Sequence, residues 1–239
     1  MSIWRWLGEA AGSGAGAVGA LIEWFGGAVA ASADPATRRQ VAFSVALIAL
    51  AAKMAKADGV VTSHEVAAFR TLFAVPAGEE RNVERLFDLA RGDVAGFEAY
   101  SARNAGFNGE DRAGLEDVLD GLFAIARADG AIHAAELAYV ERVATVFGFD
   151  AAGFGRIAAR HVVPAEGDPY LVLGVDRGWP TSRIRSRYRA LVAENHPDRA
   201  IARGLPADFV AIANDRMAAI NGAWARIEND RQRPGEPQG

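Results

Sequence analysis

The stretch Ala193-Glu194-Asn195-His196-Pro197-Asp198-Arg199 lies between two amphipathic helical segments and decides how the C-terminal part of the chain folds. Proline disfavours helical geometry in the residue before it, so we expect His196 to leave the helix and Pro197 to open a rigid turn. His196 and Asp198 then project side by side from an exposed bend. Two polar side chains held on such a bend are in a position to contact another protein.

Composition and charge restrict what the chain does. Its 239 residues carry a net charge of −4, are 51% hydrophobic and include no cysteine. This length is enough for one large or two modest domains with a buried core. The lack of cysteine excludes disulfides, thiol catalysis, Fe–S clusters and cysteine zinc sites, which fits a reducing compartment. We therefore expect a cytoplasmic protein, and the mild acidity argues against a nucleic-acid partner.

Residues 1–33 are rich in glycine and alanine and show no secretory signal. The uncharged run at 10–22 is shorter than the about 20 apolar residues that a membrane-spanning helix needs. We therefore predict a mobile or loosely helical arm. Trp4, Trp6 and Trp24 leave one alternative open, in which this segment lies on the surface of the inner membrane.

The rest of the chain shows helical periodicity almost throughout and no alternating strand pattern. We therefore predict an all-α fold. The apolar run at 41–52 is the expected central buried helix. Further helices of the first domain are expected at 63–74, 79–90, 94–103, 111–127, 134–147 and 151–161. The predicted organisation is a helical bundle at 34–162, a linker at 163–168, a small helical hairpin domain at 169–230 and a disordered tail at 231–239.

An internal repeat organises the first domain. Ala57-Asp58-Gly59 with Glu65 recurs as Ala128-Asp129-Gly130 with Glu136. Each copy predicts an apolar helix that ends at an Asp-Gly turn, followed by a glutamate in the first turn of the next helix. The spacing resembles part of an EF-hand loop. However, the two earlier ligand positions hold apolar or basic residues in both copies, which leaves too few oxygens for a calcium site of that kind.

The acidic residues of the repeat are also a candidate divalent-metal site. Asp58, Glu65, Asp129 and Glu136 would share a metal if the two turns met across a pseudo-twofold axis. The alternative is that the four residues only shape and cap the turns. No nucleophile, phosphate-binding glycine loop or zinc motif is present in the sequence, so we do not expect an enzyme.

The C-terminal domain begins with Asp168-Pro169, residue types that start a helix, and Gly174 ends that short helix. Ile184, Tyr188 and Leu191 form the buried stripe of the next helix. Basic side chains flank this stripe: Arg183, Arg185, Arg187 and Arg189. A third helix follows residues 204–206. Its apolar stripe is expected to pack antiparallel on the second helix: Phe209, Ala213, Ile220, Trp224 and Ile227.

Motifs spread over the C-terminal domain resemble the J-domain family: Tyr170-x-x-Leu173-Gly174-Val175, Arg187-Tyr188-Arg189, His196-Pro197-Asp198 and Ile220-Asn221-x-Ala223-Trp224. The two Asp-Gly repeats make residues 35–162 similar to the TerB-like domain, an all-helical module. The order of the two domains and the extended loop at 199–206 resemble J-proteins of the DjlA type. Asn195, Arg199 and Trp224 depart from that family's common residues but keep the relevant polarity or bulk.

The resemblance implies a co-chaperone that docks on a DnaK-type chaperone and stimulates its ATP hydrolysis without doing chemistry itself. His196, Pro197 and Asp198 would discriminate between the states of the chaperone. Arginines would supply the docking contacts: Arg183, Arg187, Arg189 and Arg199. The TerB-like domain would bind a partner or a metal. The competing hypothesis is a metal- or stress-responsive TerB-like binding protein in which the J-domain is only a scaffold.

Overall fold

The computed structural model describes residues 112–128, 130–161, 167–203, 205 and 209–232, together with positions 43, 47, 50, 51, 53, 54 and 78. All the regular structure of these residues is helical, which confirms the predicted all-α fold for the part described. Within these ranges, none of the helices combines the length and the hydropathy that crossing a bilayer requires. The predictions for 1–33, 63–74, 79–90, 94–103, 162–166 and 233–239 lie outside the described residues.

The N-terminal unit, taken as the described residues up to His161, contains three consecutive helices close to their predicted ranges. These are α7 (Arg112–Ala126), α8 (Ala134–Val146) and α9 (Ala151–Ala158). At the start of α9, the Asp150 carboxylate accepts a hydrogen bond of 2.8 Å from the N–H of Gly153, as a helix N-cap does. The three helices contribute to one apolar core: Val118, Leu119, Leu122, Phe123, Val140, Val143 and Ile157.

The predicted central helix at 41–52 joins the same core. Its described positions are helical and buried: Phe43, Leu47, Leu50 and Ala51. Gly121 of α7 allows this helix to approach closely, because a Cβ at Gly121 would lie 2.7 Å from Leu47 Cδ2. The prediction of a buried helix is therefore confirmed at the positions described.

The second Asp-Gly turn has the predicted geometry. Gly130 has a φ of +100°, in the left-handed region that favours glycine. The His133 N–H donates a hydrogen bond of 2.8 Å to Glu136 Oε2 at the start of α8, and Ile132 packs against the core. This turn therefore ends one helix and caps the next, as expected.

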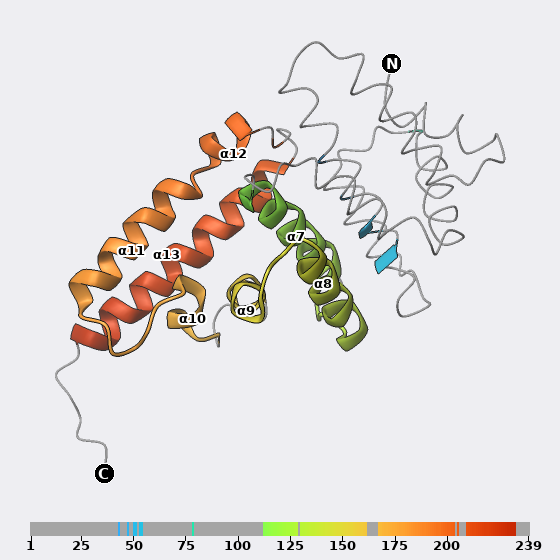
Figure 1. The fold of residues 1–239 in the computed structure, drawn as a ribbon. Helices are drawn as coiled ribbons and strands as arrows, with labels where there is room; N and C mark the ends of the chain where they lie inside the picture. The colour runs from blue at the N-terminus through green and yellow to red at the C-terminus, as the bar shows by residue number, and fades with distance from the viewer. Residues whose placement is uncertain are drawn as a thin grey trace.

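The C-terminal unit, residues 167–232, contains α10 (Pro169–Leu173), α11 (Thr181–Glu194), α12 (Pro197–Arg203) and α13 (Val210–Gln232). Asp168 accepts a hydrogen bond of 2.9 Å from the Tyr170 N–H, and Gly174 has a φ of +62°, so the predicted start and end of α10 are confirmed. Helices α11 and α13 lie side by side (Figure 1). Their shared core is apolar: Leu173, Ile184, Leu191, Ile220, Trp224 and Ile227.

Helix α12 occupies much of the segment that was expected to be an extended loop. It begins at Pro197, and the N–H groups of Arg199 and Ala200 lie 2.9 and 3.2 Å from the His196 carbonyl. Pro197 disfavours helical geometry at His196 and so separates the two helices. Its fixed φ also suits the first turn of a helix, so the same residue starts α12. The loop prediction is therefore wrong for 199–203, whereas the bend at His196 is confirmed.

Helix α13 continues through Arg231 and Gln232, into the predicted disordered tail. The Arg231 guanidinium donates hydrogen bonds of 2.8 Å to the Trp179 carbonyl and 2.6 Å to the Arg177 carbonyl. These contacts hold the last turn of α13 against the loop that precedes α11. The helix boundary therefore lies at Gln232.

The two units share buried surface. Helix α13 lies between α11 and α7 (Figure 1) and contacts both. Phe209 and Ala213 pack in the core of the N-terminal unit, and the Phe209 ring meets the Phe43 ring edge-on at 4.9 Å. The predicted packing of Phe209 and Ala213 on the second helix is therefore wrong. Phe209 and Ala213, at the start of the apolar stripe, therefore pack against the N-terminal unit. Only Ile220, Trp224 and Ile227 belong to the core shared with α11.

Candidate functional site

The bend between α11 and α12 exposes His196 and Asp198, whose side chains are 53% and 86% exposed. The Asp198 N–H donates to His196 Nδ1 at 3.2 Å, and the same nitrogen lies 3.5 Å from Asp198 Oδ2. A ring nitrogen that accepts a hydrogen bond carries no proton, so the neutral imidazole has its proton on Nε2. The bend therefore presents an exposed imidazole beside an exposed carboxylate.

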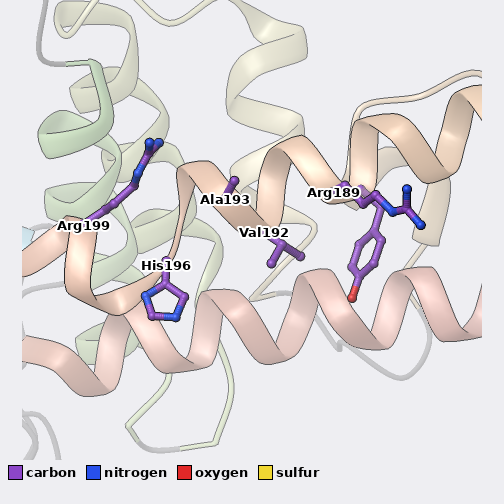
Figure 2. A pocket seen from close by; sticks show the side chains of 6 residues that line it. Arg189, Val192, Ala193, His196 and Arg199 are labelled. Atoms are coloured by element: carbon purple, nitrogen blue, oxygen red, sulfur yellow. The ribbon is translucent and has the colours of Figure 1, made fainter.

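A pocket of about 390 Å³ lies beside the bend. Its lining combines aliphatic, aromatic and basic side chains from α11, the bend and α12: Tyr188, Arg189, Val192, Ala193, His196 and Arg199 (Figure 2). Arg189 and Arg199 lie at opposite ends of this set, with Val192, Ala193 and His196 between them. The site therefore has an apolar middle and a positive charge at each end.

Helix α13 supports the aromatic wall of the pocket. The Tyr188 ring stacks on Trp224 with centroids 5.2 Å apart, and its hydroxyl donates a hydrogen bond of 3.0 Å to Asn221 Oδ1. A stacked ring with its hydroxyl bonded has little freedom to leave its position. Trp224 and Asn221 of α13 therefore fix the position of Tyr188 in the wall of the pocket.

Two of the predicted docking arginines have intramolecular partners. The Arg183 guanidinium lies 3.6 Å from the centroid of the Trp179 ring, at the start of α11. Arg187 Nη1 lies 3.6 Å from Glu194 Oε2. Their positive charge is therefore partly satisfied inside the molecule.

Arg189 and Arg199 form no ion pair within the described part of the chain. Both side chains are exposed, and both line the pocket together with His196. The structure thus brings two of the four predicted arginines to the bend. Arg183 lies at the far end of α11, and Arg187 lines a neighbouring pocket that Arg199 also borders.

A second group of charged residues, named the junction cluster, is buried between the two units. It consists of Asp117 and Asp120 on α7, Arg160 and His161 after α9, and Arg216 on α13. Arg216 Nη2 lies 2.7 Å from Asp117 Oδ1, and Arg216 Nε donates to Asp120 Oδ2. Asp120 also lies 3.3 Å from Arg160 Nη1 and 2.7 Å from His161 Nε2. Asp120 is 1% exposed and Arg216 is 2% exposed.

The junction cluster also reaches the bend. Arg216 Nη1 donates a hydrogen bond of 3.2 Å to the side-chain oxygen of Asn195. Asn195 directly precedes His196, and its Nδ2 donates 2.8 Å to the Leu191 carbonyl at the end of α11. One chain of polar contacts therefore runs from α7 to the residue beside the bend.

The electrostatics of the junction cluster favour the charged forms. Burial alone would raise the pKa of the Asp120 carboxyl, but Arg216 and Arg160 outweigh it and hold that pKa well below its usual value of 3.8. Burial alone would lower the pKa of Arg216, but Asp120 and Asp117 outweigh it and raise that pKa. Asp120 and Arg216 are therefore both charged at neutral pH.

Comparison with known proteins shows which families the chain resembles. Residues 44–159 match the family model of Tellurite resistance protein TerB. A Co-chaperone protein DjlA from Photobacterium profundum is 25% identical over 226 residues, which cover 81% of this chain and 79% of that protein. The chain is thus similar to the DjlA co-chaperones over most of its length. The predicted resemblance to DjlA-type co-chaperones with an N-terminal TerB-like domain is confirmed.

Other DjlA relatives match over a shorter part. The Co-chaperone protein DjlA from Shewanella oneidensis is 34% identical over 64 residues, 27% of this chain and 24% of that protein. The one from Mannheimia succiniciproducens is 36% identical over 64 residues, 27% of this chain and 22% of that protein. These two matches span less than a quarter of each relative. No solved structure matches the chain significantly.

Of the predicted metal ligands, Glu136 is the one that the structure describes. Its side chain is buried, and its Oε2 accepts the hydrogen bond from the His133 N–H, as a capping residue does. Asp58, Glu65 and Asp129 lie outside the described residues. A divalent-metal site at these four residues therefore stays a prediction.

The junction cluster was not among the residues predicted from the sequence, although a signal was present. Asp117 and Asp120 interrupt the apolar face of α7, and Arg216 lies on the stripe of α13 between Ala213 and Ile220. Charged residues at buried positions are expected to pair with one another. The periodicity showed that these positions were unusual, but it could not show that α7 and α13 meet.

Proposed function

We propose that this protein docks on a DnaK-type chaperone through the bend and its pocket and stimulates ATP hydrolysis by that chaperone, in the cytoplasm. The observation that carries the proposal is the exposed pair His196 and Asp198 at the edge of an apolar pocket. Arg189 and Arg199 lie beside it and form no ion pair with any residue that the structure describes. The DjlA relatives are co-chaperones by name, which supports the proposal. The chemistry of hydrolysis belongs to the partner.

Each feature of the site has a separate physical effect. Arginines without intramolecular partners attract an acidic surface and raise the rate of encounter. The apolar middle of the pocket gives the contact its buried area. His196 and Asp198 add polar contacts whose strength depends on the conformation of the partner, and a ligand shifts a conformational equilibrium only by such a difference in affinity.

The charge of the pocket predicts a salt-dependent association rate. We expect the double variant Arg189→Ala/Arg199→Ala to bind a DnaK-type chaperone about 10- to 100-fold more slowly at low salt, because both unpaired charges are lost. The difference should shrink at high salt, where screening removes the same attraction from the wild type. Stopped-flow measurement of the association rate over a range of salt concentrations checks this.

Arg185→Ala is the matched control for that experiment. Arg185 lies on the same helix, but its Nη2 is 2.8 Å from Glu228 Oε1, so its charge is already neutralised. We expect this variant to associate at about the wild-type rate. A wild-type rate for the double variant would contradict docking through the pocket, and an equal loss for Arg185→Ala would indicate a diffuse charge effect instead.

The match to the Tellurite resistance protein TerB model supports a second candidate function, a metal- or stress-responsive binding protein in which the C-terminal unit is only a scaffold. A divalent metal would then be held by Asp58, Glu65, Asp129 and Glu136. We expect the purified protein to carry metal in this case, and Asp58→Ala/Asp129→Ala to lose it, as measured by elemental analysis. Background metal in both proteins would count against this function.

A further inference from the structure

We propose that Arg216 is a positioning residue for the bend: through the junction cluster, the N-terminal unit fixes the end of α11 and thereby the pose of His196 and Asp198. This inference rests on the proposed function. It gives the N-terminal unit a role in chaperone stimulation that needs no ligand of its own.

The first step of the proposal rests on the geometry of the Arg216 guanidinium. Arg216 donates hydrogen bonds from Nε to Asp120 on α7 and from Nη1 to Asn195, and its Nη2 forms an ion pair of 2.7 Å with Asp117, also on α7. The guanidinium is planar and its donors have a fixed geometry. Once the two carboxylates of α7 set its plane, the position of Nη1 is set as well. Asn195 is therefore placed by the N-terminal unit.

Asn195 transmits this placement to the bend. Its backbone N–H and its Nδ2 both donate to the Leu191 carbonyl, at 2.9 and 2.8 Å, and its Oδ1 faces Arg216. The side chain thus uses its donor on the end of α11 and its acceptor on the junction cluster. His196 follows directly, so the direction in which the chain enters the bend depends on this residue.

The other side of the bend is anchored on the same unit. Ala200 and Leu205 are buried in the core of the N-terminal unit, and the Leu205 N–H donates 2.9 Å to the Ala200 carbonyl. The chain is therefore held by the N-terminal unit both before and after the exposed residues. A binding element held in one pose avoids the cost of ordering when it meets its partner.

Loss of the contact between Arg216 and Asn195 should lower the apparent affinity for the chaperone without lowering the maximal rate of stimulated hydrolysis. If the contact to Asn195 is lost, only a fraction of molecules has the bend in its competent pose, and the apparent dissociation constant rises as the inverse of that fraction. At saturating concentration the competent pose is selected, and His196 and Asp198 are still present. The maximal stimulated rate should therefore stay the same.

The test titrates a DnaK-type chaperone with full-length variants and measures single-turnover ATP hydrolysis. For Asn195→Ala and for Asp117→Asn we expect the concentration of half-maximal stimulation to rise about tenfold, with the maximal rate within about twofold of the wild type. Asn195→Ala removes no buried charge, so it carries the test even if Asp117→Asn lowers stability. Asn195→Asp keeps the acceptor for Arg216 but loses the Nδ2 donor to the Leu191 carbonyl, so it is expected to restore part of what Asn195→Ala loses.

A double variant tests whether the two residues act through one route. If both residues act through Arg216, the double variant Asn195→Ala/Asp117→Asn should have a half-maximal concentration no higher than that of the more affected single variant. If they act independently, the two fold-increases in half-maximal concentration should multiply. Glu228→Ala is the control, because it breaks an exposed ion pair with Arg185 in the same unit and leaves the junction cluster intact.

The outcomes separate this inference from the proposed function. If the wild type stimulates and both single variants have its half-maximal concentration, or lose maximal rate instead, Arg216 is not a positioning residue. Failure of Asn195→Asp to restore any part of what Asn195→Ala loses assigns the effect to the helix cap and overturns the inference as well. If the wild type itself gives no stimulation, the proposed function fails.

Discussion

Replacing Asp120 by alanine is expected to lower the free energy of unfolding by about 3 to 5 kcal/mol. Asp120 is 1% exposed and is the residue through which Arg160, His161 and Arg216 meet. Removing its carboxylate leaves guanidinium groups buried at the junction with one counter-ion fewer, and the desolvation cost of those groups remains. Urea unfolding followed by circular dichroism measures the change.

The control for this prediction is an exposed ion pair in the same protein. Glu228→Ala removes the partner of Arg185 at the surface, and such pairs contribute less than about 1 kcal/mol. If Asp120→Ala lowers the free energy of unfolding no more than Glu228→Ala does, the junction cluster does not stabilise the contact between the units as expected.

The effect of Asp120→Ala on the free energy of unfolding should depend on pH. The folded-state pKa of Asp120 lies below the usual 3.8, so its ionised form stabilises the fold at every pH above that value. The stabilisation is lost as the pH falls from there toward the lower folded-state pKa. We therefore expect the difference in unfolding free energy between wild type and Asp120→Ala to be complete near neutral pH and to shrink below about pH 4.

Features with local causes could be predicted from the sequence. The ranges of α7, α8 and α10 follow from apolar periodicity and from capping residues such as Asp168 and Gly174. The bend at His196 follows from the proline after it. These patterns act over a few residues, so no knowledge of the tertiary fold is needed.

Features that depend on the contact between the units could not be predicted. Ala200 and Phe209 belong to the core of the N-terminal unit, and this packing explains why 199–203 is a helix on that unit instead of an extended loop. The pairing of Arg216 with Asp120 likewise requires α13 to meet α7. The charged residues on the apolar faces of α7 and α13 mark these positions as unusual, but they do not show that the two helices meet.

Replacing His196 by glutamine is expected to bring the stimulation of ATP hydrolysis back to the unstimulated rate. Glutamine is polar and of similar reach, and the His196 side chain is 53% exposed, so the fold should stay intact. The substitution removes the exposed imidazole ring, including the Nδ1 that accepts from the Asp198 N–H. Both the contact offered to the chaperone and the local geometry of the bend are then lost.

His133→Gln is the matched control, because it makes the same chemical change at an exposed histidine on the N-terminal unit, at the start of α8. We expect this variant to stimulate as the wild type does. A loss of stimulation in both histidine variants would point to a general effect of the substitution and not to the bend.

The most direct test of the account is single-turnover ATP hydrolysis by a DnaK-type chaperone in the presence of the full-length wild type, His196→Gln or His133→Gln. The account predicts acceleration by the wild type and by His133→Gln, and the basal rate with His196→Gln. Equal acceleration by His196→Gln and the wild type, or none by the wild type, would contradict it.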